Sequence, residues 1–350
     1  MADLDFSRMA SDIKRWGIDL GFQQVAITDV DLSEYQPHLD AWIENNYHGA
    51  MDYMARNHQK RSHPDQLLPG TSRVICVRMN YANEEENSLE PMDNESSAYV
   101  SRYARGRDYH KLIRKRLQLL ADKIQNVAGP FGYRAFVDSA PVLERALGEK
   151  AGLGWIGKNT MLINKRAGSW FFLGELFTDL PLPIDAQESD HCGSCSACLD
   201  ICPTQAFVKP HLLDATRCIS YLTIELRTSI PEEFRKAMGN RVFGCDDCQL
   251  VCPWNKFTSK TREEDFTPRH QLDDCELVEL FAWSEEEFLQ RTEGSAIRRI
   301  GYECWLRNIA VGLGNAVTSA EIISALQGKQ DHSSAMVREH VTWALARHQV

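Results

Sequence analysis

Cys192-Gly-Ser-Cys195-Ser-Ala-Cys198-Leu-Asp-Ile-Cys202-Pro203 is the stretch that decides how this chain folds. Its cysteines follow the spacing C-x2-C-x2-C-x3-C-P, with which proteins bind pairs of [4Fe–4S] clusters. The short x2 spacings let one tight loop place three thiolates at the corners of a cubane. The fourth cysteine, Cys202, stands on an emerging helical turn, points away and is predicted to ligate the other cluster. Pro203 suits the first turn of a helix, where a missing N–H costs little.

A second cysteine run supplies the remaining ligands. It reads Cys245-Asp-Asp-Cys248-Gln-Leu-Val-Cys252-Pro253, which is the same pattern without its first cysteine. Cys218 lies upstream of it and is the obvious replacement. The x3 cysteines are expected to exchange partners. The predicted ligand sets are Cys192, Cys195, Cys198 and Cys252 for cluster one, and Cys202, Cys218, Cys245 and Cys248 for cluster two.

The remaining cysteines are predicted to be structural. The chain has 11 cysteines, but a cytosolic protein is unlikely to use them as a disulfide framework, because its compartment is reducing. Cys76 lies in an apolar, strand-like run, and we assign it to the core, with Cys275 and Cys304. A pair of structural zinc sites is the alternative for the two runs, since zinc also uses C-x2-C pairs, but zinc rarely needs the C-x3-C-P ending twice.

Length and charge narrow the classes of protein further. The chain has 350 residues, enough for two or three domains, and no apolar run long enough to span a membrane. The N-terminus shows no apolar segment of the signal-peptide type, so a cytoplasmic location is expected. A net charge of -10 argues against non-specific coating of nucleic acid, although residues 102–116 form a local basic segment.

Three regions are predicted along the chain. Residues 1–185 form an α/β domain, residues 186–260 the ferredoxin-like cluster domain, and residues 261–350 an acidic connector followed by helices. Within the first region, apolar periodicity and Gly or Pro boundaries predict helices over 6–20, 42–54, 108–127 and 141–147, and strands over 25–28, 73–79, 133–137 and 170–177.

The C-terminal tail is predicted to be helical. A helix is expected from residue 295 to the stop at Gly314-Asn315, followed by short amphipathic helices over 320–326 and 335–347. Paired short helices of this kind look like HEAT-type repeats, whose concave surfaces suit an extended partner. A plain helical bundle that completes the core is the alternative.

Clusters move electrons, so a further site must carry the chemistry. Asp138 follows a predicted strand, and carboxylates at strand ends of α/β folds often face the ligand crevice. Such an acid could deliver a proton, or it could cap the helix expected to open at Pro141. Lys158 lies in the glycine-rich run 152–160, which could bind a phosphate-bearing cofactor or form a tight turn.

A basic and aromatic segment offers a candidate binding surface. Residues 101–110 mix arginines with Tyr103, Tyr109 and His110, and Arg61 lies in a basic run upstream. This mixture is typical of nucleic-acid or phosphate contacts, and a solvated helix face is the alternative.

Several segments, in order along most of the chain, resemble the epoxyqueuosine reductase family. They are Ser101-Arg-Tyr-Ala-Arg-Gly-Arg-Asp-Tyr-His110, Val137-Asp138-Ser-Ala-Pro-Val-Leu-Glu-Arg145, Gly154-Trp155-Ile-Gly-Lys158-Asn159, Phe172-Leu-Gly-Glu175, both cysteine runs, and Arg307-Asn-Ile-Ala-Val-Gly-Leu-Gly-Asn315.

The resemblance implies a fold and an activity. The fold would combine an N-terminal nitroreductase-like cobalamin-binding domain, a two-cluster ferredoxin-like insert and C-terminal HEAT-like α-helical repeats. The reaction would reduce epoxyqueuosine to queuosine at the wobble position of the tRNAs for histidine, aspartate, asparagine and tyrosine. Two electrons would pass through two [4Fe–4S] clusters to cobalamin, and the epoxide oxygen would leave as water.

The resemblance also implies roles for individual residues. The catalytic proton donor falls on Asp138, whose pKa we expect desolvation beside the cofactor to raise. Arg298, Arg299 and Arg307 of the tail are candidates for phosphate contacts with tRNA. The positions implied around cobalamin are Arg61, Ser101, Asp138, Lys158, Ser220, Cys245, Asp246, Asp247 and Cys248.

Partners and rival functions follow from the same resemblance. The implied partners are tRNA carrying epoxyqueuosine in its anticodon loop and a low-potential electron donor of flavodoxin or ferredoxin type, and the chain is expected to be a monomer. A corrinoid-dependent reductive dehalogenase is one alternative, although its typical twin-arginine export signal is not expected here. A ferredoxin-type electron carrier is the other, although a carrier would not need the α/β region ahead of its clusters.

Overall fold

A computed structural model describes residues 4–83 and 89–348 of the chain. Its helices are α1 (Phe6–Asp19), α2 (Gln36–Glu44), α3 (Asp52–Arg56), α4 (His58–Ser62), α5 (Pro64–Leu67), α6 (Glu90–Asp93), α7 (Tyr109–Ala128), α8 (Glu144–Lys150), α9 (Ala197–Asp200), α10 (Ile219–Ile224), α11 (Glu232–Met238), α12 (Asp247–Leu250), α13 (Leu277–Ala282), α14 (Glu285–Arg291), α15 (Tyr302–Asn315), α16 (Ala320–Gln327) and α17 (Ala335–Arg347). In this part of the chain, no helix combines the length and apolarity needed to cross a membrane.

The strands and 3-10 helices are shorter elements. The strands are β1 (Gln24–Thr28), β2 (Arg73–Asn80), β3 (Ser97–Val100), β4 (Tyr133–Phe136), β5 (Trp155–Ile156), β6 (Leu162–Ile163), β7 (Phe171–Thr178), β8 (Phe207–Lys209), β9 (Leu212–Leu213), β10 (Arg241–Phe243) and β11 (Cys275–Glu276). The 3-10 helices are η1 (Arg102–Ala104), η2 (Ala215–Arg217), η3 (Pro253–Phe257), η4 (Glu264–Phe266) and η5 (Ala296–Ile300).

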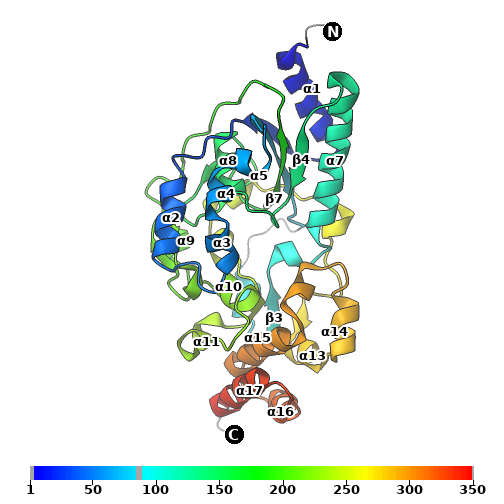
Figure 1. Cartoon of the computed structure of the whole chain (residues 1–350). Coiled ribbons are helices and arrows are strands. Elements are labelled where there is room, and N and C mark those ends of the chain that lie inside the picture. The colour runs from blue at the N-terminus through cyan, green and yellow to red at the C-terminus, as the bar shows by residue number, and fades with distance from the viewer. Residues whose placement is uncertain (1–3, 84–88, 349–350) are drawn as a thin grey trace.

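A four-stranded antiparallel sheet in the order β1-β2-β7-β4 frames the N-terminal half. Helices α1 and α7 pack on one face and α8 on the other (Figure 1). Strands β2 and β7 pair along their whole length and are almost entirely buried. Burial on both faces explains why these two strands read as nearly continuous apolar runs rather than as alternating patterns.

Helix α7 shows how the sequence sets the elements around this sheet. Asp108 is its N-cap, and the Asp108 side chain accepts the N–H of His110. Its buried residues recur at helical spacing on the side that faces the sheet, and Ile113 and Leu117 are fully buried. The helix ends at Gly129, which takes a φ of 79° that other residues seldom adopt.

A second, three-stranded sheet in the order β10-β3-β11 joins all three predicted regions. Strand β3 comes from the N-terminal region, β10 from the cluster segment and β11 from the connector. The β10–β3 pair is parallel and the β11–β3 pair antiparallel. The regions named from the sequence therefore share backbone pairing, and the boundaries at residues 185 and 260 stay a prediction.

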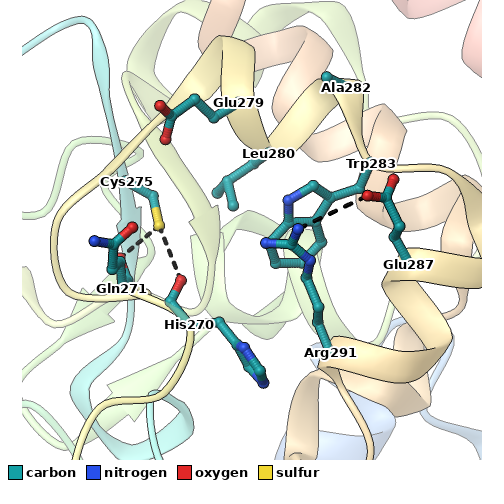
Figure 2. Close-up of a pocket in the computed structure, with 9 residues that line it drawn as sticks. All are labelled: His270, Gln271, Cys275, Glu279, Leu280, Ala282, Trp283, Glu287 and Arg291. Atoms are coloured by element: carbon teal, nitrogen blue, oxygen red, sulfur yellow. Dashed lines mark hydrogen bonds and ion pairs between the residues drawn. The ribbon is translucent and has the colours of Figure 1, made fainter.

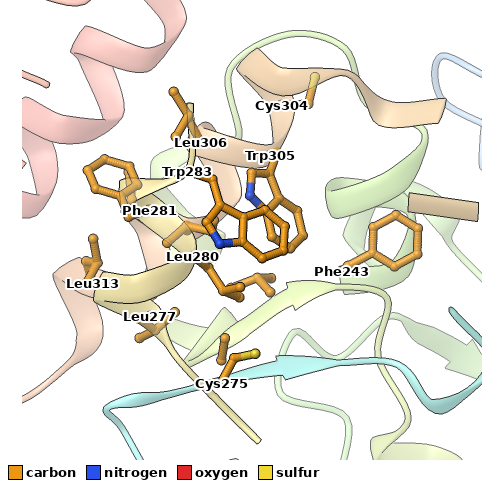
Figure 3. Close-up of a cluster of buried hydrophobic side chains, with 14 of the residues drawn as sticks. Phe243, Cys275, Leu277, Leu280, Phe281, Trp283, Cys304, Trp305, Leu306 and Leu313 are labelled. Atoms are coloured by element: carbon orange, nitrogen blue, oxygen red, sulfur yellow. The ribbon is translucent and has the colours of Figure 1, made fainter. Parts of the chain in front are cut away.

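The C-terminal helices close a large apolar cluster over this second sheet. Figure 3 shows Trp283 and Trp305 at its centre, with their rings stacked at 5.6 Å between centroids. Helix α15 is buried from Cys304 to Gly314 and packs against β10 and α17. Its close approach to α17 requires glycine, because a Cβ on Gly314 would lie 2.6 Å from the Trp343 ring.

The helix predicted over residues 42–54 is wrong, because the chain turns between α2 and α3. Asn46 and Gly49 take positive φ values of 57° and 55°. A Cβ on Gly49 would lie 2.4 Å from the Tyr221 hydroxyl. The same hydroxyl oxygen accepts a hydrogen bond from the N–H of Ala50 at 2.7 Å. Packing against α10 therefore outweighs the local helical pattern.

The helix predicted to open at Pro141 begins later. Helix α8 starts at Glu144 with Leu143 as its N-cap, so Asp138 does not cap it. The crevice rule that we applied to Asp138 belongs to parallel sheets, whereas β4 pairs with β7 antiparallel. Asp138 is instead oriented by its own backbone, which takes a φ of 54°.

Candidate active site and cluster ligands

The first predicted cysteine set lines one small cavity. Cys192, Cys195 and Cys198 come from the loop and first turn around α9, and Cys252 follows α12. Burial, followed by the charges of the other three thiols, raises the pKa of Cys198 to about 11. The structure therefore brings together the four residues that the spacing assigns to cluster one.

The second predicted set is equally close. Burial and the charges of Cys218 and Cys202, among others, raise the pKa of Cys248 well above its ordinary value. Burial, Asp247 and Cys218 do the same for the pKa of Cys245. Cys202 also contributes to the raised pKa of Cys218, and Cys252 lines the cavity of the first set, so the exchange that the x3 spacing predicts is compatible with this arrangement and stays a prediction.

The glycine-rich segment around β5 supports the first cysteine loop. Lys158 Nζ donates to the main-chain oxygens of Gly193 at 2.7 Å and Cys195 at 2.8 Å. The indole N–H of Trp155 points at Cys192 Sγ over 3.4 Å. The structure therefore places Lys158, which was expected at cobalamin, against the loop of cluster one.

The fit to iron–sulfur clusters rests on the donor set. Eight cysteines gather in two sets of four with no disulfide among them, and each cubane needs four thiolates. Within residues 4–83 and 89–348, no three His, Cys, Asp or Glu side chains converge on a site for a single metal ion. The four thiols of the first set surround a cavity, which is the arrangement that a cluster requires, and do not converge on one point as the ligands of a single ion would.

Asp138 lies at the end of β4 and meets residues from the first turn of α7. Its Oδ2 accepts the Tyr109 hydroxyl at 2.6 Å and lies 3.4 Å from His110 Nε2. The Asp138 side chain is 55% exposed, so one side of it is open to an incoming molecule. Tyr109 and His110 are buried below it and stack on each other.

On the side of His110 that faces away from Asp138, further charged residues form hydrogen bonds. His110 Nδ1 lies 2.6 Å from Asp108 Oδ1, and Arg299 Nη2 donates to Asp108 Oδ2 at 2.7 Å. The row Asp138–His110–Asp108–Arg299 therefore alternates acid and base over residues far apart in the chain. Because Asp108 also caps α7, the orientation of His110 is tied to the start of that helix.

The contacts within this row shift the pKa values of His110 and Asp138. Burial disfavours a charged imidazole, but hydrogen bonds with Asp108 and Asp138 outweigh it and raise the pKa of His110. Burial likewise favours a neutral Asp138, but hydrogen bonds from His110 and Tyr109 outweigh it and lower the pKa of Asp138. Our expectation of a raised Asp138 pKa is therefore wrong for the chain by itself, because it considered burial without these donors.

Asp246 and Asp247, implied as cobalamin contacts, are engaged within the protein. Asp246 accepts the hydroxyls of Tyr99 at 2.8 Å and Ser101 at 2.6 Å, and the N–H of Arg102 at 2.8 Å. Arg241 Nε donates to Asp247 Oδ2 at 2.7 Å. Both carboxylates are buried, so they hold the turn of cluster two in place.

Arg61 and Ser220 remain open to a further contact. Arg61 is buried, its guanidinium lies over the Tyr53 ring, and its Nε has no hydrogen-bond partner. Burial, with the charges of Glu225 and Asp138, raises the pKa of Tyr53 to about 12. Arg61 and Tyr53 therefore lie near Asp138. Ser220 is half-buried in the first turn of α10, two residues after Cys218.

The expectation that Arg307 contacts tRNA phosphates is wrong. Arg307 is fully buried, and its guanidinium donates to the main-chain oxygens of Leu222, Leu226 and Thr228. It fastens the α10 segment to α15 and cannot reach a phosphate. Arg298 and Arg299 are both exposed on η5, and Arg299 lies at the end of the row that leads to Asp138.

A separate cavity of about 410 Å³ lies in the connector (Figure 2). It shares no lining residue with the cysteine sets or with Asp138. Cys275 on its wall donates to the Gln271 main-chain oxygen at 2.5 Å, and Arg291 lies over the Trp283 ring at 4.8 Å. Cys275 is buried, as are Cys76 and Cys304, in keeping with the structural role predicted for these three.

The sequence placed His110 and Tyr109 in a basic segment without a role beside Asp138, and Glu144 and Glu175 were not predicted as site residues. A signal was present in each case. An Asp-Tyr-His run at a helix start places the second and third residues on the first turn, beside the cap. Glu175 is a charged residue inside the apolar run of β7, which is unfavourable unless the acid has a role or a partner.

Comparisons with known proteins agree with this site. Residues 61–139 match the family model described as epoxyqueuosine reductase QueG, DUF1730, and residues 191–255 match the 4Fe-4S double cluster binding domain. The epoxyqueuosine reductase of Pseudomonas aeruginosa is 63% identical over 345 residues, covering 98% of this chain and 96% of that protein. The Escherichia coli K12 enzyme is 57% identical over 344 residues, covering 98% and 90%.

Solved structures extend the likeness to the fold. An epoxyqueuosine reductase crystallised with an epoxyqueuosine-modified tRNA-Tyr stem loop is 27% identical, with a TM-score of 0.90 over 98% of this chain and 91% of that chain. The Bacillus subtilis enzyme, with its aspartate-bearing catalytic loop swung out of the active site, is 27% identical, with a TM-score of 0.87 over the same shares. The likeness covers nearly the whole chain and includes both cysteine runs, and the chain therefore belongs to the epoxyqueuosine reductase family.

Proposed function

We propose that this chain reduces epoxyqueuosine to queuosine at the wobble position of tRNA. The observation that carries the proposal is that one chain, similar from end to end to epoxyqueuosine reductases, assembles two sets of four cysteines together with the Asp138–Tyr109–His110 group. The two [4Fe–4S] clusters that these cysteines would hold would each supply one electron, and with two protons the epoxide oxygen would leave as water.

Cobalamin fits the neighbourhood of Asp138 through Arg61, whose buried Nε lacks a partner. The residues that would hold it are Arg61, Ser220 and the Cys245–Cys248 turn, whose Asp246 and Asp247 side chains act by fixing that turn. When bound, cobalamin supplies a metal centre that passes electrons at low potential to the epoxide carbons. The protein must then provide protons, orientation and exclusion of water.

The proton is the part of the reaction that this chain's own residues supply. An oxygen that leaves an epoxide becomes alkoxide-like and needs an acid in reach, and the exposed side of Asp138 offers one. His110 Nε2 lies 3.4 Å from Asp138, and the raised pKa of His110 favours the protonated imidazole that can resupply the Asp138 carboxyl. Asp138 passes that proton on, and Tyr109 fixes the carboxyl orientation.

The substrate, partners and location follow the same proposal. The substrates are the tRNAs for histidine, aspartate, asparagine and tyrosine, with Arg298 and Arg299 as phosphate contacts beside the site. The relative solved with a tRNA stem loop supports a tRNA substrate. We further propose a flavodoxin- or ferredoxin-type donor, a monomeric enzyme, a cytoplasmic location, the division at residues 185 and 260, and a HEAT-like role for α15 to α17.

The test is anaerobic incubation with epoxyqueuosine-containing tRNA, cobalamin and a low-potential reductant, followed by mass analysis of the nucleosides. Loss of one oxygen from epoxyqueuosine is expected. Unchanged epoxyqueuosine, with cobalamin and both clusters in place, would contradict the proposal. Metal analysis separates the alternatives, because iron without cobalt would indicate a simple electron carrier.

A further inference from the structure

Two glutamates behind Asp138 have no role in the mechanism so far. Glu175 is the central residue of β7, opposite Cys76 of β2 on one side and Phe136 of β4 on the other. It is fully buried among apolar residues on the face that α8 covers. Glu144 is the first residue of α8. A buried acid in the middle of a sheet is costly unless it is neutral or paired.

No N–H or O–H group of the described residues donates to the Glu175 carboxyl, and this bears on its protonation state. Neither of its carboxyl oxygens receives a hydrogen bond from an N–H or O–H group. The Glu144 carboxyl nevertheless lies within hydrogen-bonding reach of it. Two ionised carboxylates are both acceptors and repel each other, so the contact needs a proton between them.

The charged groups around the pair do not replace that proton. Glu175 faces the Cys76 thiol from β2 and the Asp138 carboxyl from the β4–α8 loop, and neither is a cation. Glu144 lies in the field of Arg61 from α4, His110 from α7 and its own neighbour Arg145, but no ion pair joins it to any of them among the described residues. Burial raises the pKa of Glu144 to about 7 and that of Glu175 well above its ordinary value.

Glu144 connects this pair to the site. Its Oε1 accepts the main-chain N–H of Asp138 at 2.5 Å. Asp138 is in the left-handed region, at a φ of 54°, which an aspartate holds only when its surroundings compensate. The contact therefore fixes the backbone that directs the Asp138 carboxyl at Tyr109 and His110.

We propose that Glu175, as a neutral carboxylic acid, is a positioning residue: it donates its proton to Glu144, which holds the Asp138 loop in its productive place. This inference rests on the proposed function, since Asp138 is the acid of that reaction. It gives the Phe172-Leu-Gly-Glu175 segment a role. A relative whose catalytic loop has swung out of the active site supports the idea that such a loop needs a restraint.

We call the Glu175–Glu144 hydrogen bond, with the contact of Glu144 to the Asp138 N–H, the latch. The latch is predicted to open at alkaline pH. Removing the shared proton leaves two carboxylates in an apolar space, and their repulsion releases the loop. The sign for stability is the same: carboxyls whose pKa is raised by folding stabilise the fold below their unfolded pKa of 4.5, and this contribution is lost as pH rises through the folded pKa.

Two variants of Glu175 and one control test the latch in the holoenzyme. Glu175→Gln keeps a neutral hydrogen-bond donor and is expected to retain kcat while losing the alkaline decline that belongs to the Glu175–Glu144 pair. Glu175→Leu removes the donor, and kcat is expected to fall by roughly 10²-fold with little change in KM, as a misplaced catalytic group does. Cys76→Ala, which removes a buried group beside Glu175 but leaves both acids, should keep the wild-type pH profile.

Infrared difference spectra in H₂O and D₂O supply a readout that does not depend on activity. The wild type should show a protonated carboxyl band that Glu175→Gln lacks. If Glu175→Leu does not fold, Glu144→Ala, which removes the acceptor for Asp138 N–H, should show the same loss of kcat. Wild-type kcat in Glu175→Leu or Glu144→Ala, or an unchanged band in Glu175→Gln, would overturn the latch. An inactive wild type that still shows the band would instead count against the proposed function.

Discussion

At the residue scale, the site is defined by Asp138, whose pKa is lowered, beside His110, whose pKa is raised. Asp138 and His110 shift in opposite directions because each stabilises the charged form of the other. Tyr109 adds a donor to Asp138 at 2.6 Å. In the proposed mechanism, His110 therefore resupplies the proton that Asp138 delivers to the departing oxygen.

Asp138→Asn is expected to abolish turnover while leaving both clusters and cobalamin bound. The amide keeps the shape but cannot transfer a proton, and loss of an acid catalyst typically costs roughly 10²- to 10⁴-fold in rate. Single-turnover kinetics with epoxyqueuosine-containing tRNA, alongside iron and cobalt analysis, measure both effects. Asp122→Asn, on the exposed side of α7, is the matched control. A near-wild-type rate in Asp138→Asn would remove Asp138 from the mechanism.

His110→Gln is expected to lower kcat by about 10²-fold and to remove one of two alkaline declines in the kcat profile, leaving the decline that belongs to the Glu175–Glu144 pair. The pKa of His110 is raised above 6.5, so the active, charged form persists below that raised pKa and is lost as pH climbs through it. The stability that the charged imidazole contributes follows the same course: it is complete below 6.5 and disappears above the folded pKa. A decline that persists unchanged in His110→Gln would assign it to another group.

At the element scale, we propose that a loop and the turn after it serve different clusters. Cys195 lies on the first loop and shares a set with Cys252, whereas Cys202, at the end of α9, lies with Cys218 and Cys248. Crossed ligation would tie the α9 and α12 segments together, because each cluster would then be bound by two parts of the chain.

Paired cysteine variants distinguish crossed from local ligation. If ligation is crossed, the double variant Cys195→Ala/Cys252→Ala disables one cluster, and Cys195→Ala/Cys202→Ala disables both. If each run instead held its own cluster, the two double variants would have the opposite effects. Iron content and electron paramagnetic resonance of the reduced protein count the clusters. Cys76→Ala, in the core, should leave both intact.

At the scale of the whole molecule, Arg307 holds the C-terminal helices to the cluster region. The guanidinium is fully buried and bonds three main-chain oxygens of the α10 segment. Burial lowers its pKa to about 10, yet it remains charged at neutral pH. The tail is therefore coupled to the clusters by a buried cation as well as by apolar packing.

Arg307→Ala is expected to destabilise the fold by a few kcal/mol, about 1–3 kcal/mol for each buried acceptor left without a donor, where such losses are not additive. Thermal unfolding measures this. The control is Arg298→Ala, on the exposed face of η5, which should leave stability unchanged but weaken tRNA binding and reduce its salt dependence. Equal effects of both variants on the salt slope would mean that Arg307 reaches the tRNA after all.

The sequence by itself determined the features that depend on short spacing. The two cysteine runs, the start of α7 at Asp108, the strands β2 and β7 and the position of Asp138 just after a strand follow from residues within a few positions of each other, where chain geometry leaves few choices. The likeness of ordered segments added the family, which the comparisons confirm.

Only the tertiary structure decided which distant residues meet. Arg307 is exposed or buried according to how α15 packs, and Glu144 reaches Glu175 only because α8 lies across the sheet. The partners of Asp138 come from another element, and they reversed the expected direction of its pKa. A proton affinity depends on every charge and donor within a few ångströms, and these are assembled by long-range packing that spacing along the chain does not specify.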